Sequence, residues 1–339
     1  MQLFDAAVLR VQAPRTISKM TKRASVVVVT WNNVEIIRHC LNSLLGLSRE
    51  HGLEVIVVDN ASSDGTPDVV QHEFPQATLI RNAENFGFAR GNNIGIEAST
   101  GRYVCLINSD VIVTEGCLEE LLQYMEAHPD IGVVGPKMIL PDGSVGRSCM
   151  GFPTIANWLW RALALDLFFR TSRRFGAYLM PYFQYTCTTD VEVLTGWFWV
   201  VRRLAMKEVG LLDERFFMYA EDIDWCKRFK DAGWRVVFYP HASAVHYCAA
   251  SSSRAPTRFY IEMRRANLQY CQRHHNRSSV GCFWLISVLH ELVRALGYCA
   301  LYLLLSRSRP DSGFKARRSR DCFLWLLGWR FAWDVKVKV

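Results

Sequence analysis

The stretch SVVVVT at residues 25–30 decides the fold, because it is a β-branched run that ends at the polar residues Asn32 and Asn33. Similar runs recur outward from it, as EVIVVD at 54–59 and YVCLIN at 103–108. Between the runs we expect helices at 34–45, 66–73 and 89–98. Such alternation predicts an α/β fold with a mostly parallel central sheet and right-handed crossovers, and ligands of these sheets bind at the carboxyl ends of the strands.

Polar residues follow the predicted strands directly, at the edge where a ligand is expected. Thr30 and Asn32 follow the first strand, residues 59–65 (DNASSDG) follow the second, and residues 108–110 (NSD) close another. The segment 59–65 alone would indicate an Asx-turn and a helix N-cap. Three polar strand ends on one edge of a sheet instead predict a binding site.

Composition and cysteine usage indicate a globular protein of a reducing compartment. Half of the 339 residues are apolar, which is enough to bury a sizeable core. The eleven cysteines are an odd number without any C-x-x-C pair, so they predict reduced thiols and a cytoplasmic location. Residues 1–22 form a leader without the apolar run of a secretion signal, and we expect Met20 to be the natural start.

The net charge of +8 arises mainly from basic residues in the last third of the chain, which flank the apolar stretches 283–305 and 323–333. This pattern favours amphipathic helices on a membrane surface over a nucleic-acid interface. His290, Glu291 and Arg294 lie in the first stretch and argue against a membrane span. The alternative is that the two helices simply pack on the rest of the protein.

The chain therefore divides into a leader at 1–22, an α/β domain at 23–275 and a helical membrane-associating region at 276–339. Within the domain, the aromatic-rich segment 151–189 is expected to be a variable helical insertion. The segment VEVLTGWFWVVRR predicts a strand pair across Gly196. The segment DERFFMYAEDIDWCKRFKDAGW predicts a loop followed by a helix that Gly233 caps.

Six stretches carry a resemblance to a known family. They are VVVVTWNN, VIVVDNASSDGT, NFGFARGNNIGI, YVCLINSDV, GLLDERFFMYAEDIDWCKR and VHYCAAS. In this order and spacing, from Ser25 to about His275, the chain resembles the inverting family 2 glycosyltransferases of GT-A fold, and within them the bacterial rhamnosyltransferase-like group.

The resemblance implies a nucleotide-sugar donor site. Asp59 matches the aspartate that hydrogen-bonds the pyrimidine base in relatives, with Thr30 and Asn32 as the opposite wall. The glycine-rich helix start NFGFARGNNIGI supplies further donor ligands, and Arg90 is expected to reach a phosphate. These further candidates are Asn85, Arg90 and Asn93.

The resemblance also implies a divalent cation, Mg²⁺ or Mn²⁺, that stabilises the leaving nucleoside diphosphate. Asp110 is its expected ligand. The family motif is often D-x-D, whereas this chain has Asn108 at the first position, so a direct carboxylate is missing there and Asn108 is expected to contact the donor. His246 matches the second metal ligand of relatives.

Inverting transfer requires a carboxylate that accepts the proton of the acceptor hydroxyl. Asp222 matches the base of the family, while Asp224 is expected to pair with Arg228 at i+4. A helix N-terminus also favours acidic residues through its dipole, which explains Asp224 without catalysis. On the acceptor side we expect Gly196, Trp197 and Glu221.

The predicted function is transfer of a single sugar to a lipid-linked or cell-envelope glycan acceptor at the inner face of the cell membrane. The resemblance favours L-rhamnose from dTDP-L-rhamnose, with a UDP-sugar donor as an alternative. A processive synthase would need Q-x-x-R-W, which the segment QYCQRHH does not match. A catalytically inactive, membrane-docked nucleotide-sugar or carbohydrate-binding module is the remaining alternative. Asp110, Asp222 and His246 are all present and argue against it.

Overall fold

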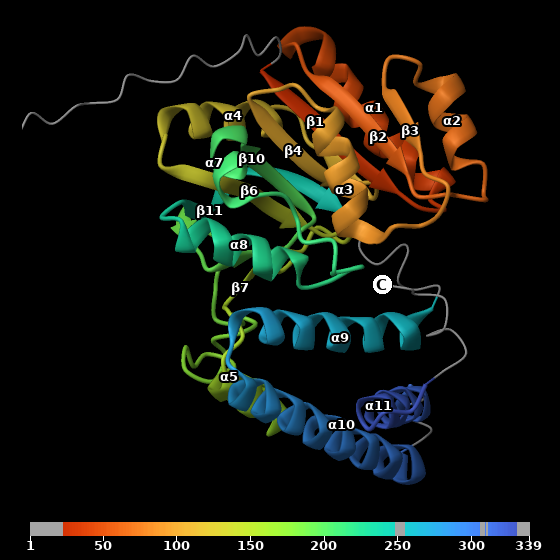
Figure 1. Cartoon of the computed structure of the whole chain (residues 1–339), viewed down its shortest axis with the longest axis vertical. Helices are drawn as coiled ribbons and strands as arrows, with labels where there is room; N and C mark the ends of the chain where they lie inside the picture. Colours follow the sequence, from red (N-terminus) through yellow and green to blue (C-terminus); the bar gives the residue numbers. More distant parts are fainter. Residues whose placement is uncertain (1–22, 248–254, 306–308, 310, 331–339) are drawn as a thin grey trace, which may run out of the picture.

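The computed structural model describes residues 23–247, 255–305, 309 and 311–330 (Figure 1). The expectations for the leader at 1–22, including a start at Met20, lie outside the described residues. The last residues of the VHYCAAS motif, from Cys248, lie outside them too.

A mixed sheet forms the centre of the molecule, and its strand order among the described residues is β3-β2-β1-β4-β10-β6-β11-β5, with β8 beside β11. The pairs β3-β2, β2-β1, β1-β4 and β6-β11 are parallel, as the alternating pattern predicts, whereas β10, β5 and β8 pair antiparallel. The strands are β1 (Ala24–Thr30), β2 (Glu54–Asp59), β3 (Thr78–Arg81), β4 (Tyr103–Asn108), β5 (Val111–Val113), β6 (Ile131–Ile139), β8 (Thr189–Asp190), β10 (Phe198–Arg202) and β11 (Arg235–His246).

Both faces of the sheet are buried under helices, which is why its strands read as continuous apolar runs. In β1, Val27 packs into the core on one face and Val26 and Val28 pack on the other. One face is covered by α1 (Val34–His51), α2 (Thr66–Glu73) and α4 (Cys117–Ala127), and the other by α3 (Gly87–Ala98), α7 (Arg203–Val209) and α8 (Glu221–Asp231). Gly233 follows α8 with φ +86°, as expected for its cap.

The register of the parallel strands brings their polar ends together. Thr30 of β1 stands opposite Asp59 of β2, and Val29 stands opposite Asn108 of β4. The sequence prediction of one polar edge is therefore confirmed.

The predicted strand pair across Gly196 is wrong. Two strands do flank this glycine, but β9 (Val193–Leu194) pairs with β7 (Cys149–Met150) in a separate small sheet, while β10 joins the central sheet. Residues 195–197 thus connect two sheets instead of forming a hairpin turn, and they carry Gly196 and Trp197 to the polar edge.

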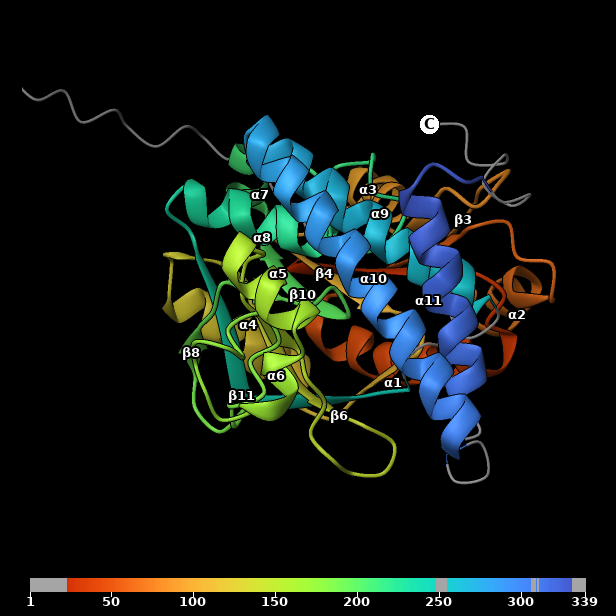
Figure 2. The same ribbon diagram turned by 90° about the horizontal axis from the view of Figure 1, so that it is seen from below.

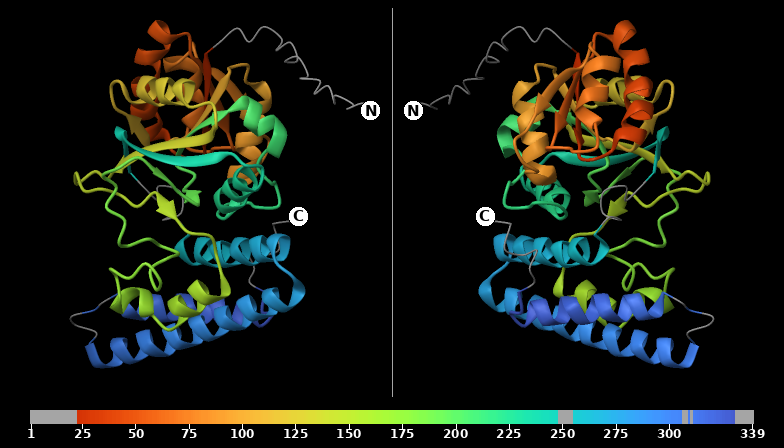
Figure 3. Two further views of the ribbon diagram at one scale, coloured as in Figure 1. Left: turned by 90° about the vertical axis from the view of Figure 1, so that its left-hand side faces the viewer. Right: turned by 90° about the vertical axis from the view of Figure 1, so that its right-hand side faces the viewer.

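A layer of helices lies beneath the sheet, as Figures 2 and 3 show from below and from the sides. It contains α5 (Ile155–Ala162), α6 (Leu165–Phe168), α9 (Pro256–His274), α10 (Arg277–Leu305) and α11 (Ser312–Leu326). α9 packs on both α8 and α10, and α10 also packs on α5 and α11. The α/β part and the C-terminal helices are therefore connected through α9.

Two expectations for these helices need correction. The insertion 151–189 is helical only in α5 and α6, and turns fill most of its remainder. The last helix is α11, which begins well before residue 323, because its first turn packs on α10 with Gly313 against the ring of Tyr302. The basic residues at 315–320 consequently lie on a helix and not in a linker.

The helix α10 is long and apolar enough to cross a bilayer by length and composition, and only 22% of its most apolar stretch is buried within the protein. The polar residues near its middle face inward: His290 is 3% exposed and Glu291 is fully buried. Its outer face carries exposed apolar side chains, namely Leu285, Leu289, Leu292, Val293, Leu296, Leu303 and Leu304.

Candidate active site

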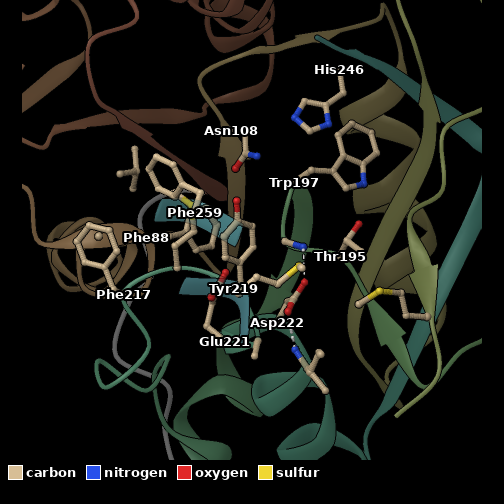
Figure 4. A pocket seen from close by; sticks show the side chains of 18 of the residues that line it. Phe88, Asn108, Thr195, Trp197, Phe217, Tyr219, Glu221, Asp222, His246 and Phe259 are labelled. Carbon is tan, nitrogen blue, oxygen red and sulfur yellow. Dashed lines mark hydrogen bonds between the residues drawn. The ribbon is translucent and has the colours of Figure 1, made fainter. Parts of the chain in front are cut away.

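A cavity of about 590 Å³ opens between the polar edge of the sheet and the helical layer. Figure 4 shows part of its lining, with Asp222 and Glu221 on one side and Trp197 and His246 on another. The predicted site residues that line it are Thr30, Asn85, Asn108, Asp110, Gly196, Trp197, Glu221, Asp222 and His246. Residues from distant parts of the chain thus meet at one site.

Thr30 and Asp59 each carry a buried polar atom without a hydrogen-bond partner among the described residues, but only Thr30 lines the cavity. Thr30 is 1% exposed and Asp59 is 2% exposed. Asp59 Oδ2 accepts a hydrogen bond from Ser62 N at 3.0 Å, but Asp59 Oδ1 and Thr30 Oγ1 find no partner among the described residues. An unpaired buried polar atom is costly, so a ligand with matching donors and acceptors would be favoured here.

Asn32 and Asn85 shape loops of the polar edge. Asn32 has φ +50°, and its Oδ1 accepts from Ser63 N at 2.7 Å, which ties the loops after β1 and β2 together. Asn32 does not line the cavity, whereas Asn85 does and accepts from Gly87 N at 2.9 Å. The expected Asx-turn is present at Asp64, whose Oδ1 accepts from Thr66 N at 3.0 Å.

Arg90 and Asn93 lie outside the cavity lining, contrary to the expectation of donor contacts. The Asn93 amide is occupied by the protein, because its Nδ2 donates to Leu212 O at 2.9 Å and its Oδ1 accepts from Leu212 N at 3.1 Å. Arg90 is half-exposed, stacks on Phe86 and faces Glu214 at 3.7 Å. Both side chains brace α3, and we leave them out of the proposed donor site.

Asp110 and His246 lie side by side at the cavity, with Asp110 Oδ1 3.1 Å from His246 Nε2. The ring of Trp197 stacks on His246 at 5.4 Å and fixes its plane. Among the described residues no group of three His, Cys, Asp or Glu side chains gathers to hold a metal. The pair would therefore supply part of a coordination shell, which fits a cation that also takes substrate phosphates and water.

Asp222 lies in the first turn of α8 and faces the cavity. Its carboxylate accepts hydrogen bonds from Ile223 N at 2.8 Å and, more weakly, from Gly196 N at 3.4 Å, drawn as dashed lines in Figure 4. Burial raises the pKa of Asp222 to about 6, although both backbone bonds oppose this rise. A carboxylate with such a pKa is ionised at neutral pH and is a stronger proton acceptor than an ordinary aspartate.

Glu221 precedes Asp222 and is buried. Burial, and then the charge of Asp222, raise the pKa of Glu221 well above its ordinary value. Its Oε2 is buried without a partner among the described residues. This shift favours the protonated form of Glu221, whose hydroxyl can donate to a ligand.

Asp224 has a structural role. It is fully buried and pairs with Arg228 at 2.9 Å, as predicted from the i+4 spacing. It also accepts from two side chains of α9 that were not predicted, Arg273 at 3.0 Å and His274 at 2.7 Å. Asp224 thus ties α8 to α9.

The backbone before the acidic cluster is strained. Tyr219 and Ala220 have φ values of +72° and +62°, a region that costs side-chain-bearing residues free energy. Together they turn the chain sharply into α8 and set the position of Asp222. Tyr219 also lines the cavity.

The lower wall of the cavity comes from the helical layer, and its residues were not predicted from the sequence. On α9, Phe259, Met263, Arg264 and Asn267 recur at helical spacing and face the cavity. The spacing of these four residues was the signal that could have identified them. The insertion contributes Trp158, Arg161 and Tyr178.

Comparison with known proteins identifies the family of the chain. The sequence profile of the family described as Glycosyl transferase family 2 matches residues 25–210. The N-acetylglucosaminyl-diphospho-decaprenol L-rhamnosyltransferase of Mycobacterium tuberculosis is 32% identical over 248 residues, which cover 70% of this chain and 80% of that protein.

Solved structures agree on the fold. A mannosyltransferase from Pyrobaculum calidifontis in complex with GDP-Man and Mn²⁺ matches with a TM-score of 0.54 and 17% identity, over 93% of this chain and 91% of that chain. GalNAc-T7 with UDP, GalNAc and Mn²⁺ matches with a TM-score of 0.54 and 14% identity, over 93% and 57%. The profile, the relative and the fold agree, and the chain is a family 2 glycosyltransferase of GT-A fold.

Proposed function

We propose that the chain transfers a single L-rhamnose from dTDP-L-rhamnose, with inversion, to a lipid-linked glycan acceptor at the cytoplasmic face of the membrane. The mycobacterial relative, whose name gives this sugar and a diphospho-decaprenol acceptor, supports the choice of substrates. The observation that carries the proposal is Asp222, a half-buried carboxylate with a raised pKa at the cavity.

In the proposed reaction, the oxygen of the acceptor hydroxyl attacks the anomeric carbon and its proton passes to Asp222. The new glycosidic bond forms as the bond to the nucleoside diphosphate breaks on the opposite face. Glu221, whose protonated form is favoured by burial, donates a hydrogen bond to the acceptor, and Gly196 and Trp197 lie beside that acceptor.

On the donor side, the unpartnered atoms of Thr30 and Asp59 receive the base. The hydrogen-bonding edge of a pyrimidine carries both donors and acceptors, which suits this pair of groups. Asn85 and Asn108 line the cavity and would contact the donor between its pyrimidine and Asp110. Asp110 and His246 would hold a divalent cation, Mg²⁺ or Mn²⁺, that neutralises the charge of the diphosphate.

Membrane association is proposed from the outer surface of the helical layer. α10 carries exposed leucines, and Leu167, Phe168 and Phe169 at the end of α6 are exposed too; Figure 2 shows both helices in the helical layer from below. Exposed Arg170, Arg173 and Arg174 follow in sequence, and such a mixture suits an interface with anionic lipids.

The proposal is tested by incubating the protein and anionic vesicles with a panel of nucleotide sugars and a sugar-diphosphate-lipid acceptor. We expect product only with dTDP-L-rhamnose. The anomeric configuration of the transferred sugar should be opposite to its configuration in the donor. Product from a UDP-sugar instead would correct the donor, and retention of configuration would exclude Asp222 as a simple base. Asp222→Asn is the control for background transfer.

A further inference from the structure

The cavity has a second polar end, in the helical layer and away from Asp110 and His246. Arg161 of α5 and Arg264 of α9 line the cavity there, and Tyr178 and Asn267 line it beside them. Figure 3 shows α5 and α9 beneath the sheet, so this end belongs to the opposite wall of the cavity. The donor contacts proposed above need neither arginine.

Arg264 is held in place from behind by α10. It is 5% exposed, and its Nε and Nη2 bond to Glu291 Oε1 at 2.9 Å and 2.7 Å. Tyr260 donates to the same carboxylate at 2.8 Å. The guanidinium is therefore oriented before any ligand arrives, which lowers the entropy cost of binding.

Arg161 lacks the hydrogen-bond partners that hold Arg264. Its Nη1 is buried and makes no hydrogen bond within the described residues, although Asp166 Oδ2 lies 3.5 Å away. Burial lowers the pKa of Arg161, and the nearby charges of Arg264 and Arg294 lower it further. A buried cation without full compensation favours an anion beside it.

The charges around this end of the cavity sum to a positive value. Arg161, Arg264 and Arg294 face two carboxylates, those of Asp166 and Glu291. The imidazole among them is neutral, because burial and then the three arginines lower the pKa of His290 to about 2. A ligand that brings negative charge is therefore favoured.

This positive end of the cavity is close enough to Asp222 for the charges of both to act on Tyr178. Burial raises the pKa of Tyr178 to about 12, Arg161 and Arg264 oppose that rise, and the charge of Asp222 adds to it. The Arg161 guanidinium lies 5.3 Å from the Tyr178 ring. Asn267 is 5% exposed and lines the cavity, and its Oδ1 has no partner among the described residues.

We propose that Arg161 and Arg264 form an anion subsite that binds the phosphate group by which the acceptor sugar is linked to its lipid, and so hold that sugar at Asp222. The inference rests on the proposed function and names what the acceptor must carry. Arg161 is the stronger test because Arg264 also supports the fold through Glu291. Asn267 would accept a hydrogen bond from a hydroxyl of the same acceptor.

The test compares two acceptors of the same sugar, one linked to farnesyl diphosphate and one to neutral octanol. In Arg161→Gln we expect kcat/KM for the diphosphate acceptor to fall by about 10- to 100-fold, mainly through KM, as for a lost charge-assisted hydrogen bond. Transfer to the octyl glycoside and hydrolysis of the donor by water should not change. Arg102→Gln, an exposed arginine just before β4 and outside the cavity lining, is the matched control and should behave as wild type.

An equal loss on both acceptors, or an equal loss in Arg102→Gln, would overturn the subsite. Binding of Arg161→Gln to anionic vesicles should equal that of wild type, and a loss there would show that Arg161 meets a bilayer headgroup instead. If wild type hydrolyses the donor but uses neither acceptor, the proposed acceptor class has failed. Farnesyl diphosphate binding, measured with chelator present, then decides the subsite alone: weaker binding to Arg161→Gln supports it, and equal binding contradicts it.

Discussion

Replacing Asp222 by asparagine should inactivate the enzyme and stabilise its fold at the same time. Asparagine keeps the size of the side chain and can accept from Ile223 N, but it cannot accept the acceptor proton. A positioned base contributes roughly 10²–10⁴-fold to the rate, so kcat should fall by about that factor while the donor Kd stays unchanged.

The gain in stability follows from the pKa of the carboxyl group. Burial raises this pKa from 3.8 to about 6, which means that the fold disfavours the charged form. At about 1.4 kcal/mol per pKa unit, removing the charge adds at most about 3 kcal/mol to the free energy of unfolding above pH 6. The gain should shrink as pH falls from 6 toward 3.8, because wild-type Asp222 becomes protonated in the folded state and the folded protein then carries no buried charge there.

Single-turnover rates with saturating donor and urea unfolding at pH 5 and pH 8 measure both effects. The wild-type rate should rise with pH to a plateau above about 6, following ionisation of Asp222. Glu221→Gln is the matched comparison and should lose far less activity, because burial favours the uncharged form of Glu221, which glutamine resembles. An Asp222→Asn enzyme within a few-fold of wild type, or one equally stabilised at both pH values, would refute this account.

The other predictions concern the fold, the metal and the membrane. Asp224→Asn should lower the free energy of unfolding by roughly 3 kcal/mol in urea titrations, since it leaves buried cations unpaired, and should leave kcat unchanged in the folded fraction. Asp110→Ala should abolish turnover and the metal-dependent rise in Tm with nucleoside diphosphate, and His246→Ala should do less; chelator-resistant wild-type turnover would contradict both. Leu296→Asp should weaken sedimentation with anionic vesicles, whereas Leu204→Asp, equally exposed on α7, should not.

The sheet and its polar edge could be predicted because local patterns determine them. EVIVVD and YVCLIN coincide with β2 and β4, and α2 begins and ends where expected, since strands buried on both faces leave a continuous apolar signal. The meeting of Asp110 with His246 followed from the family resemblance and not from spacing, because 136 positions separate them.

The helical layer could not be predicted in the same way. The limits of α11 depend on contacts with α10 that no local pattern encodes, such as Gly313 against Tyr302. Arg264 appears in sequence as one more basic residue, yet Glu291 orients it toward the cavity from another helix. Asn93, conversely, matched a donor motif but is bonded to Leu212.

The two walls of the cavity come from different stretches of the chain. The edge of the sheet derives mainly from residues before 111, and the opposite wall derives from α5, Tyr178 and α9. Recombination between related genes could therefore replace one wall and keep the other. A chimera that receives segments 155–178 and 255–305 from a relative should inherit the acceptor of that relative while its nucleotide preference stays with the recipient. Diversity of glycan linkages can arise in this way without rebuilding the catalytic centre.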